Sequence, residues 1–285
     1  MHAAPFDYER PATLDEAFSL LGKEGARPLA GGHSLLPAMK LRVSSPTTLV
    51  DIGRIPGMGA IEQNGGGLTI GALTTHEAVA ASEVVAADCP LLAETARHIG
   101  DAQVRARGTI GGSIAHADPA ADYPTALLAL GATVNTASAG GTRQIAAGDF
   151  FVDIFTTALE PGELVTSVTV PSMPAETGGA YVKHRHPASS YAVVGVAALV
   201  MLDGASITGA RLAVGGVAGK PVTVDVSGLA GQAPSAEAFA SAAAAVGEAL
   251  DNPLGDLYAS GEFRVHLAGV LARRALAAAA ERAAG

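Results

Sequence analysis

Two adjacent glycines with a hydroxyl side chain on either side stand within the segment 108–122. Gly111 and Gly112 lie between Thr109 and Ser113. Adjacent glycines let the backbone adopt conformations closed to other residues, and exposed backbone N–H groups in such a turn bind anions. A neighbouring hydroxyl can add a hydrogen bond to a phosphate. The segment therefore predicts a phosphate-binding loop, with an ordinary surface turn as the alternative.

A second glycine pair of the same kind occurs near the N-terminus. Gly31 and Gly32 follow a short apolar stretch and precede His33 and Ser34. Two such segments in one chain favour two walls around one phosphate-bearing ligand more strongly than either segment does alone. Two alternatives remain: His33 is a turn residue bonded to the backbone, or both glycine segments are only turns of a non-enzymatic scaffold.

A histidine and two carboxylates, His116, Asp118 and Asp122, follow the central glycine pair. They could be drawn as a metal site, but an Asp before Pro119 is better explained as the cap of a helix that begins there. Residues 6–10 are expected to form the first strand, and no G-x-G-x-x-G fingerprint follows it. No nucleophile elbow is present. The segment 215–221 resembles a P-loop, but it is one residue short and has a proline where a magnesium-binding hydroxyl is needed.

Composition excludes several classes of protein. The chain has 285 residues and a net charge of −9, without a cluster of lysines and arginines, so no nucleic-acid partner is expected. Its single cysteine, Cys89, cannot form an internal disulfide, an iron–sulfur cluster or a cysteine-based zinc site. We expect Cys89 to be a small buried hydrophobe and the protein to be cytoplasmic, because no signal-like or membrane-spanning run is recognisable.

Local patterns predict several element boundaries. Thr13, with Glu16 three residues later, predicts a capped helix that continues to Leu21. A further helix is expected to begin at Thr74 or Thr75.

Glycine turns at 140–141 and 203–204 predict hairpins. The apolar segment 149–155 is expected in the core. The Pro- and Gly-rich stretch 171–179 predicts a linker. Strands precede helices beyond this linker, which predicts an α+β module at the C-terminus.

The two glycine segments, in this order and followed by 118–122, resemble those of the FAD-binding medium subunits of the molybdenum hydroxylases. Within that family, the aerobic carbon monoxide dehydrogenase branch is the most similar. The resemblance covers essentially the whole chain and extends to the strand 163–171 and to the motifs around Lys183 and Tyr191.

The resemblance implies an α+β fold in two domains. A two-part FAD-binding domain of the PCMH (vanillyl-alcohol oxidase-like) type is expected over residues 1–175, with subdomains 1–56 and 57–175. A C-terminal domain with an antiparallel sheet and a helix bundle is expected over residues 178–285.

The resemblance also implies which residues contact FAD. In the family the two glycine segments wrap the pyrophosphate and the ribityl chain. Here the segments correspond to Ala30, Gly31, Gly32, His33, Ser34 and Leu35, and to Thr109, Ile110, Gly111, Gly112 and Ser113.

Five further residues match family positions around the flavin. Asp122 matches a residue that hydrogen-bonds the cofactor, and Ile99 and Val165 match apolar residues that line its pocket. Lys183 matches a basic residue near the pyrimidine edge, where a cation stabilises reduced, anionic flavin. Tyr191 is similar to an aromatic residue close to the isoalloxazine, with a core tyrosine as the alternative. No catalytic residue is expected, and the roles of His33, His76 and His116 stay open.

The resemblance implies a subunit of a larger enzyme. A molybdopterin cofactor is expected on a large subunit and two [2Fe–2S] clusters on a small subunit, in a dimer of heterotrimers. Electrons would pass from the clusters to FAD and on to an external acceptor, for which a quinone or a cytochrome is preferred. Carbon monoxide is the first expected substrate, and an N-heterocycle or an aldehyde is the second. A stand-alone FAD oxidase is a further alternative, and association of the complex with the inner face of the membrane stays open.

Overall fold

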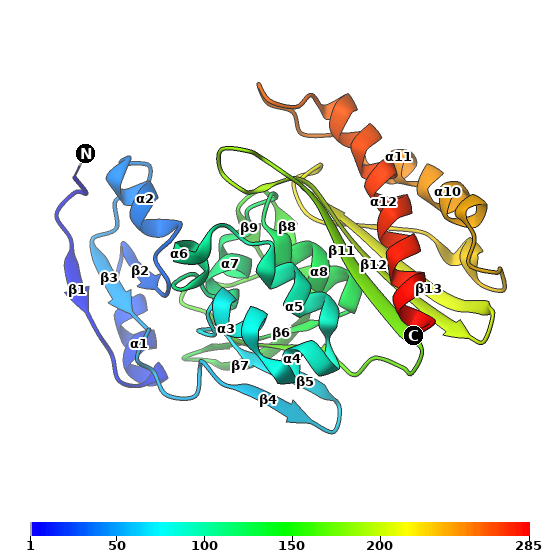
Figure 1. Cartoon of the computed structure of the whole chain (residues 1–285). Coiled ribbons are helices and arrows are strands. Elements are labelled where there is room, and N and C mark those ends of the chain that lie inside the picture. Colours follow the sequence, from blue (N-terminus) through cyan, green and yellow to red (C-terminus); the bar gives the residue numbers. More distant parts are fainter. Residues whose placement is uncertain (1) are drawn as a thin grey trace.

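The computed structural model describes residues 2–285, and three regions follow one another along the chain (Figure 1). The N-terminal region is a parallel three-stranded sheet in the order β1-β3-β2. Its strands and helices are β1 (Asp7–Glu9), α1 (Leu14–Leu21), β2 (Ala26–Leu29), α2 (Leu35–Lys40) and β3 (Thr48–Asp51). The cap predicted for α1 is confirmed, because Thr13 Oγ1 accepts the N–H of Glu16 at 3.2 Å.

The middle region is built on an antiparallel five-stranded sheet in the order β4-β5-β10-β6-β7. Its strands are β4 (Ile61–Asn64), β5 (Gly67–Gly71), β6 (Thr133–Ser138), β7 (Gly141–Ala146) and β10 (Leu164–Pro171). The hairpin predicted at 140–141 joins β6 to β7 and is confirmed.

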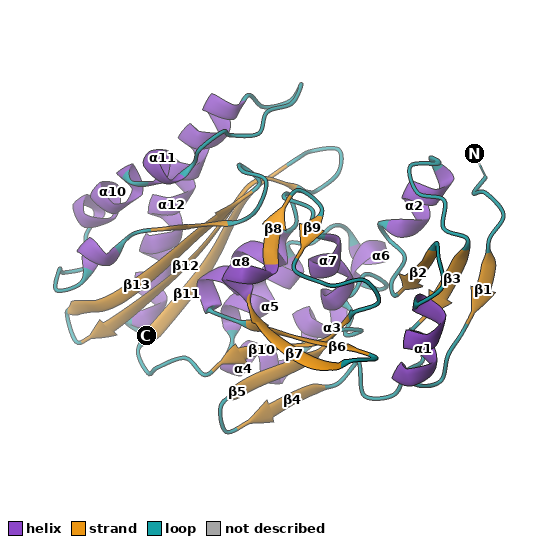
Figure 2. Ribbon diagram, turned by 180° about the vertical axis from the view of Figure 1, so that it is seen from behind, coloured by secondary structure: helices purple, strands orange, loops and turns teal. Residues whose placement is uncertain are grey.

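Of the helices of the middle region, α5 (Pro90–Arg97) and α8 (Asp122–Leu130) lie between this sheet and the C-terminal region, whereas α6 (Ala102–Arg105) lies on the side of the N-terminal region (Figure 2). The helices of this region are α3 (His76–Ala81), α4 (Glu83–Asp88), α5 (Pro90–Arg97), α6 (Ala102–Arg105), α7 (Ile110–His116), α8 (Asp122–Leu130) and α9 (Ala147–Phe150). Helix α3 begins after Thr75, whose hydroxyl accepts the N–H of Ala78 at 3.2 Å, as one of the two predicted caps.

A short hairpin of β8 (Phe151–Asp153) and β9 (Thr156–Thr157) corrects one expectation about the core. Phe150 and Phe151 are buried, but Phe155 is 57 % exposed. The prediction that the whole segment 149–155 lies in the core is therefore wrong, because the chain turns outward between the two strands.

The C-terminal region is an antiparallel four-stranded sheet in the order β11-β12-β13-β14. Its elements are β11 (Thr177–Arg185), β12 (Ala192–Asp203), β13 (Ser206–Gly215), β14 (Val222–Val224), the 3₁₀ turn Ser227–Leu229, α10 (Ala236–Ala244), α11 (Val246–Ala249) and α12 (Gly261–Ala283). The hairpin predicted at 203–204 joins β12 to β13 and is confirmed.

The sheet of the C-terminal region is buried on both faces. Val196 and Val200 of β12 belong to the core under α12, whereas Ala197 and Leu199 belong to the core of the middle region. Burial on both faces explains why β12 is an almost continuous apolar run. Helix α12 approaches β11 so closely that a Cβ atom on Gly178 would overlap a carbonyl oxygen of the helix.

The predicted α+β class, with a two-part first domain followed by an antiparallel sheet and helices, is confirmed. The domain boundaries at residues 56, 175 and 178 stay predictions. Among residues 2–285, no helix is both long enough and apolar enough to cross a membrane.

Candidate functional site

The fold brings the two glycine segments into contact. A Cβ atom on Gly31 would overlap the carbonyl oxygen of Arg107 and lie 2.8 Å from the Cα of Gly108. A Cβ atom on Gly112 would lie 3.8 Å from the Cβ of Ala30. The N-terminal region therefore meets the middle region at the two motifs that the sequence singled out.

The first glycine segment is a loop between β2 and α2 that leaves a row of backbone donors free. Gly32 has a φ of +75°, which favours glycine. The amide N–H groups of residues 31–35 donate no hydrogen bond to any atom of residues 2–285. Such a row of consecutive unpaired amides is the kind of concavity that binds an anion.

Two side chains of this loop have different surroundings. The His33 ring lies with Nδ1 3.0 Å from the carbonyl oxygen of Gly31, so the alternative of a turn residue bonded to the backbone is confirmed for its geometry. Ser34 stands at the N-terminus of α2, but its hydroxyl caps no helix N–H. That hydroxyl is therefore available to a ligand.

The second glycine segment is not a turn, and the prediction of a loop at Gly111 and Gly112 is wrong. Both residues lie in the first turn of α7, where Thr109 Oγ1 accepts the N–H of Gly112 at 3.1 Å. The N–H of Gly111 donates to Ala72 O at 2.8 Å, and that of Ile110 donates to Thr74 O at 3.0 Å. These amides are used by the fold, because α7 is docked against the strand end that carries Ala72.

Glycine serves close packing in α7. A Cβ atom on Gly111 would overlap the side chain of Ala72. Gly112 is exposed and Ser113 is half-buried, and Gly112 lies beside Ala30, which directly precedes the free amides of residues 31–35.

The turn 118–121 also differs from its prediction. Asp118 Oδ1 accepts the N–H of Ala120 at 2.9 Å within the turn, and α8 begins only at Asp122. Asp118 is therefore not a helix cap. The C-terminal region holds the turn, because Ala192 N–H donates to Ala120 O at 3.1 Å and Gly216 N–H donates to Pro119 O at 2.9 Å.

A buried ion pair lies behind this turn. Lys183 Nζ on β11 donates to Asp122 Oδ2 at 2.8 Å, and the two side chains are 1 % and 4 % exposed. Asp122 Oδ1 accepts the hydroxyl of Tyr181 at 2.6 Å. Burial raises the pKa of Asp122 and lowers the pKa of Lys183, and each group opposes the shift of the other by its charge.

One N–H group of Lys183 has no acceptor among the described residues. Its ammonium carries three N–H groups, and the described residues provide acceptors for two: Asp122 Oδ2 and the carbonyl oxygen of His98 at 3.0 Å. A buried unused donor is costly, so a ligand acceptor beside Lys183 would be favourable. The pairing with Asp122 is absent from the sequence pattern because 61 positions separate the residues.

Tyr191 lies at the junction of all three regions. It is 41 % exposed, so the alternative of a core tyrosine is wrong. Burial of its hydroxyl raises its pKa, the charge of Asp118 raises it further, and the nearby hydroxyl of Ser34 lowers it. These neighbours place the ring beside the first glycine loop.

The other predicted residues lie in three different surroundings. Val165 is buried on β10, and Ile99 is half-buried just after α5, where its carbonyl oxygen accepts Arg105 Nη1 at 3.3 Å. His116 ends α7, and its ring centroid is 4.9 Å from that of Phe155.

The fold buries polar groups just before α3, in α3 and in α8, which the sequence pattern does not predict. Thr74 Oγ1, His76 Nδ1 and the hydroxyl of Tyr123 are buried and have no hydrogen-bond partner among residues 2–285. The rings of His76 and Tyr123 lie 5.4 Å apart. Burial lowers the pKa of His76 to about 4, so its imidazole is neutral at pH 7.

A cavity lies away from this site. It has a volume of about 380 Å³ and lies beside the stretch 171–179, with Cys89, Thr177 and Arg282 in its wall. Cys89 is 1 % exposed, as expected for a buried hydrophobe, and burial raises its pKa to about 11.

Comparisons with known proteins agree with this architecture. The family described as "FAD binding domain in molybdopterin dehydrogenase" matches residues 4–173, and "CO dehydrogenase flavoprotein C-terminal domain" matches residues 179–279. The carbon monoxide dehydrogenase medium chain of Afipia carboxidovorans is 39 % identical over 282 residues, which is 98 % of each chain.

Two further relatives cover nearly the whole chain. The nicotine 6-hydroxylase medium subunit of Paenarthrobacter nicotinovorans is 36 % identical and covers 96 % of this chain and 97 % of its own. A chain in the crystal structure of cyanide-inactivated Cu,Mo-CO dehydrogenase superposes with a TM-score of 0.95 at 37 % identity, over 99 % of this chain and 100 % of its own. The protein described here belongs to the family of FAD-binding medium subunits of the molybdenum hydroxylases.

Proposed function

We propose that this chain holds FAD at the junction of the two glycine segments and passes electrons as one subunit of a molybdenum hydroxylase. The observation that carries the proposal is the row of unpaired amides at residues 31–35, next to the exposed Gly112 in the first turn of α7. These amides fit the pyrophosphate of FAD, which needs hydrogen-bond donors and no lysine. FAD supplies chemistry that side chains lack, because it takes up and gives out electrons.

The remaining candidate residues fit the flavin end of the cofactor. Lys183 would offer its third N–H and its positive charge to the pyrimidine edge. Asp122 would hold Lys183 in place, and each of its oxygens keeps a lone pair for the cofactor. Tyr191 would lie against the ring system, with Ile99 and Val165 in the apolar wall.

The chain's partners follow from the same proposal. A large subunit would carry the molybdenum cofactor and the substrate site, and a small subunit would carry the two [2Fe–2S] clusters. Carbon monoxide is the first proposed substrate, because carbon monoxide dehydrogenase medium chains are among the relatives that match nearly the whole chain. We also propose a dimer of heterotrimers in the cytoplasm with a quinone or a cytochrome as acceptor.

A second candidate is the medium subunit of an N-heterocycle or aldehyde hydroxylase. It is favoured by the nicotine 6-hydroxylase medium subunit, which is 36 % identical. The chain itself does not discriminate between these substrates, because the substrate would bind on the large subunit.

The test is to purify the chain with the subunits that accompany it and record the visible spectrum. A flavin spectrum and about one FAD per chain after acid extraction are expected, and a colourless complex would refute the proposal. Anaerobic addition of carbon monoxide, an N-heterocycle or an aldehyde then identifies the substrate by which compound bleaches the flavin band. Bleaching of the isolated chain by any of them would instead favour a stand-alone oxidase.

A further inference from the structure

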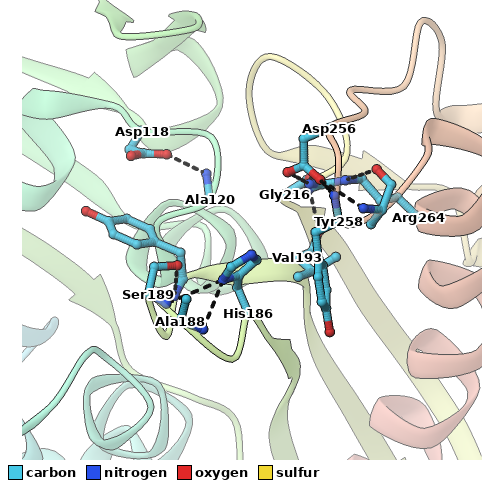
Figure 3. A network of polar contacts seen from close by, with 12 residues as sticks. Asp118, Ala120, His186, Ala188, Ser189, Val193, Gly216, Asp256, Tyr258 and Arg264 are labelled. Atoms are coloured by element: carbon cyan, nitrogen blue, oxygen red, sulfur yellow. Dashed lines mark hydrogen bonds and ion pairs between the residues drawn. The ribbon is translucent and has the colours of Figure 1, made fainter.

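The loop that carries Tyr191 is closed by the histidine at its start. The loop joins β11 to β12, and the N–H of His186 donates to Tyr191 O at 2.8 Å. His186 Nδ1 also accepts the N–H of Ala188 at 3.2 Å and that of Ser189 at 3.4 Å (Figure 3). The backbone closes the same loop, because the N–H of Ser190 donates to His186 O at 2.9 Å, and the imidazole adds an acceptor for two further N–H groups.

The ring of His186 is in turn fixed by Tyr258. The two ring centroids lie 4.6 Å apart with an interplanar angle of 60°, which is an edge-to-face contact. The neighbouring ring of His184 on β11 stacks on Tyr258 from 6.4 Å. Tyr258 is 46 % exposed and belongs to the segment between α11 and α12, so its position depends on what holds that segment.

Arg264 holds the segment through Asp256. Asp256 Oδ1 accepts the N–H groups of Tyr258 and Ala259 at 2.8 and 2.9 Å, and its Oδ2 accepts Arg264 Nη2 at 2.6 Å. Arg264 is 7 % exposed, and its Nη1 also donates to Val193 O at 2.9 Å and to Gly216 O at 2.7 Å. One guanidinium therefore ties the segment of Tyr258 to the start of β12 (Figure 3).

The start of β12 and the end of β13 also reach the proposed flavin site. Ala192 precedes Val193, and Gly216 is itself bonded by Arg264. The N–H groups of Ala192 and Gly216 donate to the turn 118–121. Tyr191 directly precedes β12, next to Ser34 and Asp118. A continuous series of contacts thus runs from buried Arg264 to the exposed ring of Tyr191.

We propose that His186, held by Tyr258, is the positioning residue that fixes Tyr191 at the cofactor site. This inference rests on the proposed FAD function. His186 acts through Tyr191 and does not contact the cofactor. Its Nδ1 accepts the loop N–H groups and is the essential atom, and its ring makes the contact with Tyr258.

Three substitutions separate these features. His186→Ala removes both the acceptor and the ring, His186→Asn keeps an acceptor oxygen that can bond the N–H two residues on, and His186→Phe keeps only the ring. The phenylalanine variant covers the case in which the alanine variant is unstable. Leu257→Ala is the matched control, because Leu257 adjoins Tyr258 and is fully exposed.

The experiment is an FAD titration of the flavin-stripped complex, with each variant alone and combined with Tyr191→Leu. We expect His186→Ala and His186→Phe to weaken FAD binding about tenfold, with His186→Asn and Leu257→Ala within about twofold of the parent. In the Tyr191→Leu background, His186→Ala should cause no further loss, since the two residues act as one unit.

Two results would overturn the inference alone. One is unchanged FAD affinity in both His186→Ala and His186→Phe while the parent binds FAD, and the other is an equal loss with and without Tyr191. A parent complex that binds no FAD would overturn the proposed function itself, and the two failures are therefore distinguishable.

Discussion

The α-carbon of Gly31 faces the carbonyl oxygen of Arg107 so closely that no side chain fits between the two backbones. This contact joins the N-terminal region to the segment that leads into α7. The free amides of residues 31–35 begin at the same point. Separation of the two backbones would therefore open the proposed pyrophosphate site.

Gly31→Ala is expected to reduce both stability and cofactor content. Overpacking of a tight contact costs about 2 kcal/mol, and the added methyl would push the two segments apart. Thermal unfolding and the FAD content of the purified complex measure the two effects. Gly59→Ala is the control, because a Cβ atom there would meet nothing within 4 Å. Equal FAD content in both variants would contradict the prediction.

Lys183→Met is expected to destabilise the protein by about 3 kcal/mol at pH 7, because it leaves the buried carboxylate of Asp122 without its counter-charge. The double variant Lys183→Met, Asp122→Asn should recover part of the loss, since it contains no buried charge at this place. Urea unfolding measures both, with the exposed Lys220→Met as the control.

The loss in Lys183→Met should shrink as the pH falls. Burial already raises the pKa of Asp122, and removal of Lys183 raises it further. Such a carboxyl binds its proton more tightly in the folded than in the unfolded state, so the penalty is present above its folded pKa and disappears below its unfolded pKa. A gap to the parent that is equal at pH 7 and pH 4.5 would argue against this origin.

His76 is expected to make stability pH-dependent below neutrality. Its folded pKa of about 4 lies below the ordinary histidine value of about 6.5, so the unfolded state binds the proton first. Stability is then fully present above about pH 6.5 and decreases by about 2 kcal/mol between pH 7 and pH 5. Urea unfolding at the two pH values should show a smaller decrease in His76→Phe.

The exposed His266→Phe is the matched control for this measurement and should retain the parent's decrease. Burial also lowers the pKa of His98, so some dependence on pH will remain in the His76 variant. An unchanged slope in His76→Phe would assign the whole effect to other groups.

Thr109→Val is expected to destabilise the protein by about 1 kcal/mol, because the N–H of Gly112 loses the hydroxyl that caps α7. Thr109→Ser keeps the hydroxyl and should stay within a few tenths of a kcal/mol of the parent. The same pair of variants tests whether the first turn of α7 contributes to FAD binding. A valine variant as stable as the serine variant would exclude a role for the cap.

Local features could be predicted from the sequence, and features that depend on distant residues could not. Thr13 and Thr75 cap helices as predicted, because a cap needs only the residues of its own first turn. The helix that contains Gly111 and Gly112 was predicted as a turn. Glycines disfavour helix, and here the fold overrides this preference through bonds to Ala72 and Thr74.

In the candidate site, too, local features could be predicted and contacts between distant residues could not. Both glycine segments were identified from their composition and the family resemblance, and the fold places them in contact. The bond between Lys183 and Asp122, and the unpaired Nδ1 of His76, arise from tertiary packing. Neither leaves a signal in the spacing of residues.

The proposed cofactor-binding residues come from both sides of the connection between β10 and β11, which matters for chimeric proteins. The linker predicted at 171–179 is shorter in the structure, because Pro171 ends β10 and Thr177 begins β11. A cut within residues 172–176 would leave both glycine segments in the first fragment and place Lys183 and Tyr191 in the second. Exchange of the C-terminal fragment between relatives would therefore replace Lys183 and Tyr191, which are proposed to lie at the flavin. Exchange of the first fragment would replace the amides that are proposed to bind the pyrophosphate. The two fragments of such a chimera must match at Lys183, because its buried ammonium bonds Asp122 and His98 of the first fragment.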